Sequence, residues 1–439
     1  MENKVIKFKE QFYNNHNAFK KGLNGESTTE LNQFRENALQ SFGKLPLPTT
    51  KDEEWRYTNI LPLLQSDFNI ADKETSVSKK LINNYQFDEL KSNQLVFING
   101  YYSAENSKFN KLPDGVIIGS LANAIDNHPD IVLKHFGKYA NDDHQIFTAL
   151  NTAFIVDGAF VYVPAGKTVE DPIHIIFITS ESDKKIITQP RNLFIAGKNS
   201  RLTIIEHYVS DDENIYFTNA VTEVYTNENA VFEHIKLQEE SRNAFHIAMM
   251  DVAQERYSNF SSFSFSKGAA ITRNNFNSKF NDEGSECTMN GLFLINDTQL
   301  FDVHTLIDHA RAHCDSHEHY IGILDDKAKG VFNGKVIVRQ DAQKTNAFQK
   351  NNNIILSDNA LVNTKPQLEI FADDVKCSHG ATIGQIDEEA KFYLKSRGIS
   401  DKSATAMLLK AFASSVILPI TVESVRKYID EILSKRFNN

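Results

Sequence analysis

Short runs of β-branched and aromatic residues dominate the middle of the chain. Between about Phe154 and Gly384 they recur as FVYVPAG, IHIIFITS, RLTIIEHYVS, GLFLIND and GKVIVRQ, separated by Asn, Asp, Gly and Ser. No helical periodicity interrupts them, so this region is predicted to consist of strands joined by turns. It is long for one sandwich, whereas a parallel β-helix lengthens by adding coils that bury their inner faces on one another. A double-sheet jelly roll is the competing architecture.

The pattern before this region is mainly helical. Apolar residues at helical spacing follow Ser27 and Glu30, which have the spacing of a capping box. They are Leu31, Phe34, Ala38 and Phe42, and Gly43 with Pro46 and Pro48 then end the helix. DEEWRYT, which carries the only tryptophan, Trp55, is interpreted as a docking or packing element. QLVFING, at 94–100, is predicted to be a strand.

Helical spacing returns after Gly384. Asp387 is a plausible N-cap and Gly398 a stop for a first helix, a second is predicted over 403–416, and a third follows Pro419. This small domain either caps the end of the β stack or offers an amphipathic face to a partner, and the two alternatives are compatible. The chain is therefore divided into a mainly helical region at 1–150, a β-helix core at 151–385 and a helical domain at 386–439.

Composition narrows the class of protein. The chain has 439 residues, 41% hydrophobic and 24% charged, with a net charge of −10. Such acidity argues against a general nucleic-acid binder. No apolar run is long enough for a transmembrane helix, and the first residues lack the apolar segment of a signal peptide. Three widely spaced cysteines without a CxxC pair fit a reducing compartment, so we expect a cytoplasmic protein without a membrane partner.

The densest cluster of metal-binding residue types is HTLIDHARAHCDSHEHY, with five histidines and Cys314 between His304 and Tyr320. Imidazole and thiolate suit zinc, copper or iron, so one interpretation is a metal site. The other is a single strand that directs His309, His313, His317 and His319 outward. In that strand Cys314 points inward as a small buried residue. We expect the second.

Two other features are expected to be structural, and two catalytic motifs are absent from the sequence. Cys287, between a glycine turn and a strand, is predicted to be buried. Asp373 and Asp374 are adjacent, so on a strand they would point to opposite faces, and a turn is favoured over an acid–base pair. No Gly-rich phosphate loop and no GxSxG sequence occur, so any ATP chemistry must come from a partner.

VKCSHGATIG, at 375–384, remains as a candidate site. On a strand, Cys377 and His379 point to the same face and are near enough to share a ligand, and Lys376 is placed to help keep a thiolate accessible. Two ligands do not complete a metal site, which usually needs four, so the rest would come from another chain. The residues alone leave this interpretation and a structural turn open.

Longer stretches carry a family resemblance. LEIFADDVKCSHGATIGQIDEEAKFYLKSRGIS, at 368–400, resembles the signature of the SufB/SufD family of iron–sulfur cluster assembly proteins. DEEWRYT, NGLFL, DHARAHCDSHEHYIGIL and GVFNGKVIVRQDAQKTNAFQKNNNIILS agree in order, so the resemblance runs from about Pro46 onward. KCSHGAT is similar to the SufD branch, and a CxxC-type motif near the N-terminus, common in the SufB branch, is absent.

The resemblance implies a fold and a role. The fold is mainly β: a right-handed parallel β-helix with an N-terminal helical region and a small C-terminal helical domain. The role is a non-catalytic scaffold that pairs with a SufB-like paralogue through the β-helix ends and binds a SufC-like ABC-type ATPase through its C-terminal helices. His379, with Cys377 beside it, would be this chain's ligand to iron or a nascent cluster at the interface. No resident cofactor is expected in the isolated chain, which is a plausible homodimer.

Two alternatives of another class remain beside the scaffold. One is a His-rich metalloenzyme built on residues 304–319. The other is a carbohydrate-acting β-helix enzyme with acid, base or calcium groups along a groove.

Overall fold

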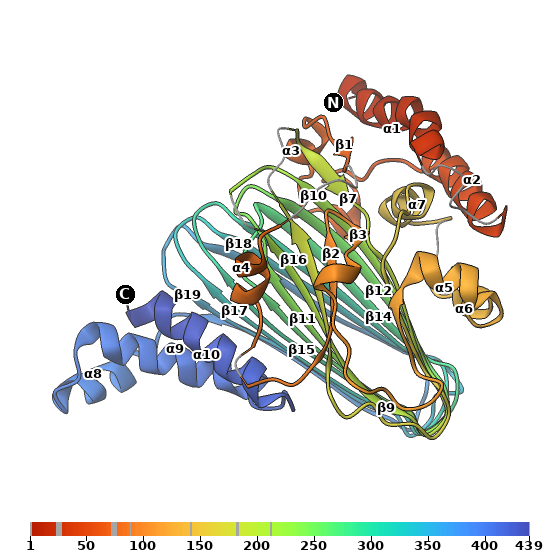
Figure 1. Cartoon of the computed structure of the whole chain (residues 1–439). Coiled ribbons are helices and arrows are strands. Elements are labelled where there is room, and N and C mark those ends of the chain that lie inside the picture. The colour runs from red at the N-terminus through yellow and green to blue at the C-terminus, as the bar shows by residue number, and fades with distance from the viewer. Residues whose placement is uncertain are drawn as a thin grey trace.

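The computed structural model describes residues 2–22, 29–71, 77–87, 89–140, 143–180, 184–210 and 213–438. Two sheets of mostly parallel strands face each other and form a flattened β-helix (Figure 1). The N-terminal helices lie at one side of this stack and the C-terminal helices at the opposite side. The fold is therefore the predicted parallel β-helix, and the parallel ladders rule out the jelly roll.

The first sheet contains 11 strands. Its main path runs from the last strand of the stack back to the first: β20 (Leu361–Ile370), β18 (Lys329–Val338), β16 (Leu300–His309), β14 (Ile271–Phe280), β12 (Phe245–Gln254), β10 (Phe217–Thr226), β8 (Arg191–Ala196), β5 (Ala159–Val163) and β4 (Ile117–Ser120). The short strands β1 (Asn69–Ile70) and β7 (Ile186–Thr188) pair beside this path. Only β4 and β5 are antiparallel in this sheet.

The second sheet contains 10 strands. Its order is β21 (Lys376–Gly384), β19 (Asn346–Ile355), β17 (Asp315–Leu324), β15 (Glu286–Ile295), β13 (Asn259–Ser266), β11 (Val231–Glu239), β9 (Arg201–Ser210), β6 (Ile173–Thr179), β2 (Asn93–Ile98) and β3 (Tyr101–Tyr102). The predicted strand at 94–100 is thus β2, which pairs in parallel with β6. Each coil of the stack contributes one strand to each sheet.

Register stacks the inward side chains of successive coils in columns. One column of the second sheet runs from Phe232 through Phe260, Cys287 and Ser316 to Ala347, and all five side chains are buried. Neighbouring strands lie about 4.8 Å apart, so each side chain packs on those directly before and after it. Every inner position is therefore covered as long as another coil follows.

Tight turns connect the two sheets. Asn199 and Asn229 adopt positive φ angles of 55° and 56° after β8 and β10, and Asp297 and Asp326 both have 53° after β15 and β17. Asn and Asp are the side chains that tolerate this left-handed conformation best after glycine. The Asn and Asp punctuation of the sequence therefore marks the corners of the coils.

Helices α1 (Glu2–Gly22) and α2 (Thr29–Lys44) bury the face predicted for this region. Leu31, Ala38 and Phe42 are buried and Phe34 is half-buried, while Ser27 of the predicted capping box lies outside the described residues. The region that follows holds several short helices: α3 (Leu61–Leu64), α4 (Lys79–Asn84), α5 (Leu121–Asn127), α6 (Pro129–His135) and α7 (Ile146–Ala153), with the 3-10 turns η1 (Glu53–Trp55) and η2 (Ala104–Asn106).

The C-terminal domain consists of α8 (Glu388–Ser396), α9 (Asp401–Ile417) and α10 (Glu423–Asn438). The predicted N-cap is present, because the Asp387 carboxylate accepts from the N–H groups of Glu389 and Ala390. Leu409, Ala413 and Val416 of α9 pack in one cluster with Ile321 and Ile323 on the outer face of the second sheet. The expectation that these helices cap the end of the stack is therefore wrong, since they cover its side (Figure 1).

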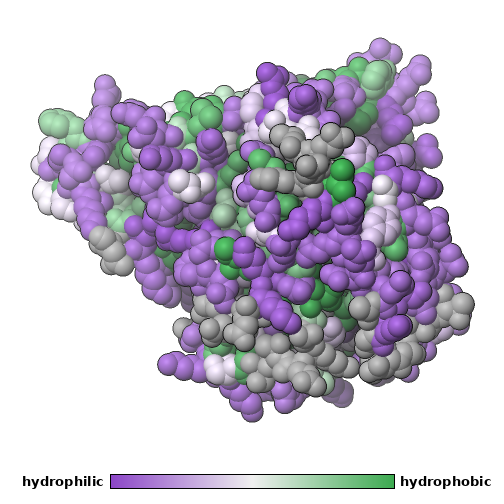
Figure 2. Space-filling view, turned by 90° about the horizontal axis from the view of Figure 1, so that it is seen from above, coloured by the Kyte–Doolittle hydropathy of each residue, from purple (hydrophilic) through white to green (hydrophobic). Residues whose placement is uncertain are grey.

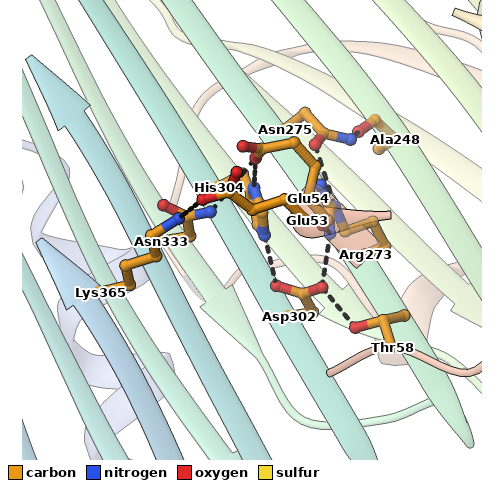
Figure 3. Close-up of polar contacts among 10 residues, drawn as sticks. All are labelled: Glu53, Glu54, Thr58, Ala248, Arg273, Asn275, Asp302, His304, Asn333 and Lys365. Carbon is orange, nitrogen blue, oxygen red and sulfur yellow. Dashed lines mark hydrogen bonds and ion pairs between the residues drawn. The ribbon is translucent and has the colours of Figure 1, made fainter. Parts of the chain in front are cut away.

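DEEWRYT is a packing element on the outer face of the first sheet (Figure 3). The guanidinium of Arg273 lies over the Trp55 ring at 4.4 Å and donates to Asp302 at 2.6 Å. Glu54 accepts from His304 at 3.1 Å and from Asn333 at 3.2 Å. Two further contacts join Thr58 to Asp302 and Glu53 to Lys365 of β20. We call residues 52–58 the strap. It joins the N-terminal region to β14, β16, β18 and β20, and β20 belongs to the last coil.

Among the residues that the structure describes, no helix is both long and apolar enough to cross a membrane.

Replacing Asp302 tests the strap. Burial opposes ionisation of this carboxyl, but Arg273 and His304 prevail and hold its pKa at about 2. Its folded pKa is thus below the unfolded value, so its ionised form stabilises the protein above about pH 4 and loses this contribution as the pH falls through 2. The linked free energy is roughly 2 kcal/mol.

We expect Asp302→Asn to lower stability at pH 7, because it leaves the Arg273 charge buried without its anion, and to remove this part of the acid dependence. Denaturant unfolding at pH 7 and pH 3 measures both effects. Asp67→Asn is the matched control, because the Lys7–Asp67 pair is exposed and such pairs contribute about 1 kcal/mol or less. Equal losses for the two variants would contradict the strap's role.

Candidate functional site at the end of the β-helix

The β-helix ends at β20 and β21, and within the described residues no strand pairs with the outer edge of either. On β21, Cys377 lies beside Ala347 and His379 beside Gln349 in the ladder with β19. Ala347 and Gln349 are buried and face the interior of the coil. Cys377 and His379 therefore share the inward side, as expected for their spacing, but on the one coil that no further coil covers.

Cys377 is half-buried and packs against an apolar cluster that includes Val338, Ala342, Ala347 and Ala372. Burial raises the pKa of its thiol, and the Ala347 backbone offsets this only in part. Lys376 points away on the exposed side. The expectation that the surroundings favour a thiolate is therefore not met, because burial disfavours the ionised form of Cys377.

His379 is exposed, and it has no hydrogen bond or ion pair with any residue that the structure describes. Its imidazole is therefore available to an external ligand. Across those same residues, no group of three or more His, Cys, Asp and Glu side chains is arranged to hold a metal ion. Cys377 and His379 thus form at most part of a ligand set.

Apolar side chains surround this end of the stack. Phe371, which follows β20, is 64% exposed, and Ile370 beside it is also exposed. Leu361 at the start of β20 and Ile383 near the end of β21 complete the set. We call Leu361, Ile370, Phe371 and Ile383 the end rim. Exposed apolar groups beside unpaired strand edges are typical of a surface that another chain covers.

Two buried polar residues lie behind His379 and were not found from the sequence. Gln349 of β19 and Glu318 of β17 precede it in the same inward column, and the Gln349 Nε2 donates to the Glu318 Oε2 at 2.6 Å. Burial raises the pKa of Glu318 to about 7. The alternation of side chains along β17 and β19 does place Glu318 and Gln349 on the inner face. A sequence pattern does not indicate this, because polar residues are not expected on the inner face of a β-helix.

The histidine cluster is not one strand. β16 ends at His309, residues 310–314 form a turn in which His313 has φ 60°, and β17 begins at Asp315. His309 is buried rather than outward, its Nε2 lies 2.8 Å from the Ser316 hydroxyl, and burial lowers its pKa to about 3. The predicted single strand is therefore wrong from 310 to 314, although Cys314 is buried as expected.

The other histidines of this stretch have separate partners, although His317 and His319 both lie on the outer face of β17, as expected. His304 contacts Glu54 in the strap. His317 stacks on Phe348 with ring centroids 5.3 Å apart, and the His319 Nε2 lies 2.9 Å from the Asn352 side-chain oxygen. Among the described residues, the histidines at 304–319 form no group of three or more side chains that could hold a metal ion.

Cys287 and Cys314 are buried, as predicted for Cys287 from its position before a strand. Burial raises the pKa of Cys287 to about 12 and that of Cys314 to about 11. Neither thiol is suited to nucleophilic chemistry in the folded protein, because the thiolate is the reactive form.

A second polar cluster lies inside the middle coils. The His246 Nδ1 lies 2.7 Å from Glu240, the His234 Nε2 lies 3.4 Å from Glu206, and the Lys236 Nζ lies 2.9 Å from the His246 Nε2. All five side chains are buried, and burial lowers the pKa of Lys236 to about 8. Charges of this kind are paired with one another in the interior, so we assign them a structural role.

The cysteines provide a direct test of this arrangement. We expect iodoacetamide to modify Cys377 in the folded chain, slowly at pH 7 and faster as the pH rises, because its thiol is half-buried and mostly protonated. Cys287 and Cys314 should react only after unfolding. Peptide mapping by mass spectrometry, with and without denaturant, measures all three, and modification of Cys287 at the rate of Cys377 would contradict the fold of these coils.

Comparison with known proteins supplies the family. Residues 177–412 match the family described as SUF system FeS cluster assembly, SufBD core domain, and residues 6–175 match the SufBD protein N-terminal region. An iron–sulfur cluster assembly SufBD family protein of Synechocystis is 35% identical over 422 residues, which are 94% of this chain and 93% of the relative.

Two further relatives carry the SufD name. The iron–sulfur cluster assembly protein SufD of Escherichia coli is 31% identical over 402 residues, 89% of each chain. The SufD protein of Bacillus subtilis is 27% identical over 419 residues, 92% of this chain and 94% of the relative. The matches cover both the N-terminal region and the β-helix, and this chain therefore belongs to the SufB/SufD family of iron–sulfur cluster assembly proteins.

Proposed function

We propose that this chain is a SufD-type scaffold subunit that supplies one side of an iron–sulfur cluster assembly site. The observation that carries the proposal is the position of Cys377 and His379 on the inward face of the last, uncovered coil. The names of the Escherichia coli and Bacillus subtilis relatives agree with it.

An incomplete ligand set suits this role. Iron–sulfur clusters are held mostly by thiolates, and histidine replaces cysteine in some of them. One imidazole and one protonated thiol bind iron weakly by themselves, so the partner must contribute the remaining ligands. A site divided between two chains forms when they dock and opens when they rotate, which lets a scaffold release the cluster that it has built.

The expected partner at this end is a SufB-like paralogue. β20 and β21 present unpaired edges, and the end rim provides apolar side chains beside them. The end of a second β-helix offers matching edges, so the two stacks can continue each other. In the absence of that paralogue, the same surface is available to a second copy of this chain, which supports a homodimer of the isolated protein.

Helix α8 is the proposed contact for a SufC-like ABC-type ATPase. None of its residues is buried, and it lies at the outer end of the C-terminal helices (Figure 1). Phe392 and Tyr393 of this helix are 72% and 57% exposed. Hydrophobic residues are also visible at the surface of this end of the molecule, at the left of Figure 2. An uncovered aromatic pair on a helix is a common anchor for a partner.

The chain alone is proposed to have no catalytic activity, and ATP hydrolysis is assigned to the partner. The histidines at 304–319 form no group among the described residues that could hold a metal ion, which gives the metalloenzyme alternative no support. The carbohydrate-acting alternative loses its basis because both parts of the chain match a family of cluster assembly proteins.

Replacement of His379 tests the assembly site. We expect His379→Ala to lower the cluster content of the reconstituted complex by about tenfold or more, because it removes a ligand without disturbing a packed side chain. Absorbance and iron content of the complex measure this. His317→Ala is the matched control, being an exposed histidine on the outer face, and its effect should be small. Unchanged cluster content in His379→Ala would remove this residue from the site.

Replacement of both aromatic residues of α8 tests the ATPase contact. We expect Phe392→Ala with Tyr393→Ala to weaken binding of the SufC-like ATPase by about tenfold or more, since anchors of this kind dominate binding energy. Calorimetric titration measures the affinity, and thermal unfolding confirms the fold. Ile6→Ala, which truncates an exposed apolar residue of α1, should leave the affinity unchanged. Full affinity in the double variant would place the contact elsewhere.

A further inference from the structure

The column of inward side chains that ends at His379 has an unusual composition. Register places Met289, Glu318, Gln349 and His379 one above another on β15, β17, β19 and β21. Successive members lie on neighbouring strands, which are about 4.8 Å apart, so each side chain lies against its neighbours in the column. A carboxylate and an amide thus lie directly behind an exposed imidazole.

The Gln349 amide group has a hydrogen-bond partner for its nitrogen but none for its oxygen among the described residues. Gln349 and Glu318 are each only 3% exposed. The Gln349 Nε2 donates to the Glu318 Oε2 at 2.6 Å, but the Gln349 Oε1 has no hydrogen-bond partner among the residues that the structure describes. Buried carbonyl oxygens are nearly always paired, so an orphan acceptor of this kind indicates a missing donor.

Of the other two inward amides of β19, Asn353 also has an oxygen without a partner among the described residues, whereas Asn351 does not. Asn351, two residues along, accepts from Asn353 Nδ2 at 2.6 Å and donates to the Tyr320 carbonyl at 3.1 Å. Its oxygen is therefore occupied within the coil. The oxygen of Gln349, which lies next to His379, is not.

The opposite sheet leaves space for this amide. Gly334 of β18 faces it, and a Cβ at that position would lie 2.3 Å from the Gln349 Nε2 and 2.7 Å from its Cδ. Any larger residue would displace the amide from Glu318. The position of Gln349 is therefore held from two directions, by the carboxylate and by the space beside Gly334.

We propose that Gln349 is a positioning residue for His379. The structure holds no hydrogen bond between the two side chains, and a turn of the exposed ring toward the column would let the Gln349 Oε1 accept the N–H of one ring nitrogen. This bond would fix the tautomer and the ring orientation, so that the other nitrogen presents its lone pair to the open end of the stack. Histidines that bind metals commonly donate their second N–H to a carbonyl or carboxylate in this way. Glu318 holds the amide in the required orientation. The positioning of the ring does not depend on the proposed function. Only the statement that the other ring nitrogen binds a ligand rests on it.

The tautomer of His379 is measurable without any metal or partner. The ring ¹⁵N spectrum of the full-length chain is recorded at a pH where the imidazole is neutral. We expect one His379 tautomer to exceed the other by about fivefold, because one net hydrogen bond corresponds to a ratio of about this size. In Gln349→Leu this excess should fall to the ratio of the exposed His317. A wild-type His379 with the ratio of His317, or an excess unchanged by Gln349→Leu, would overturn the proposal.

Two further variants separate positioning from simple loss of structure. Glu318→Gln retains an acceptor for the Gln349 amide and should keep most of the tautomer excess, whereas Glu318→Leu should lose it. Gly334→Ala should lose it as well, because it displaces the amide while leaving Gln349 in the sequence. Thermal unfolding of each variant confirms that it is folded when its His379 tautomer ratio is measured. A wild-type tautomer ratio in folded Gly334→Ala or folded Glu318→Leu would contradict the proposal.

The readout also distinguishes this inference from the function on which it rests. If His379→Ala leaves cluster formation intact while the tautomer excess depends on Gln349, the scaffold site is wrong and the positioning is right. If His379→Ala abolishes cluster formation but the tautomer ratio equals that of His317, the site is right and the positioning is wrong.

Discussion

In-register parallel stacking is the constraint on which this molecule depends. A parallel coil satisfies the hydrogen bonds of its two edges and the packing of its inner face only through the coils before and after it. Along most of the stack this produces buried columns such as Phe232–Phe260–Cys287. At the last coil the same constraint produces the opposite result: β20 and β21 have free edges, and inward positions reach the surface. The proposed site is therefore a continuation of the core, exposed because the stack ends.

The other parts of the chain leave that end open. The N-terminal strap crosses the outer face of the first sheet as far as Lys365, and the C-terminal helices cover the outer face of the second (Figure 1). Both attach to the sides of the β-helix, where outward apolar and polar columns offer contacts, and neither covers the end rim. This arrangement keeps apart the two surfaces that we propose for partners, the open end with His379 and the exposed helix α8.

Buried polar pairs occur both in the middle coils, far from the open end, and directly behind the last coil. Glu240 and His246 in the middle coils pair with each other. Glu318 and Gln349 also form a pair but lie next to the open end, and one acceptor atom of each has no partner among the described residues. The two pairs thus differ in their position in the stack, since only the second lies directly behind His379 in its column.

Local patterns in the sequence determined the class of structure but not the coils. Alternation and Asn or Asp corners identified the strands, and the Cys-x-His spacing correctly placed Cys377 and His379 on one face. The coil length was not evident, since Phe245, Ile271, Leu300, Lys329 and Leu361 share a column although the steps between them are 26, 29, 29 and 32 residues. The local pattern also does not distinguish the turn at 310–314 from a strand. Only the tertiary structure decided which coil is last, that the helices cover a side rather than the end, and that Glu318 and Gln349 stand behind His379, because register between strands far apart in sequence is set by packing and not by any local run of residues.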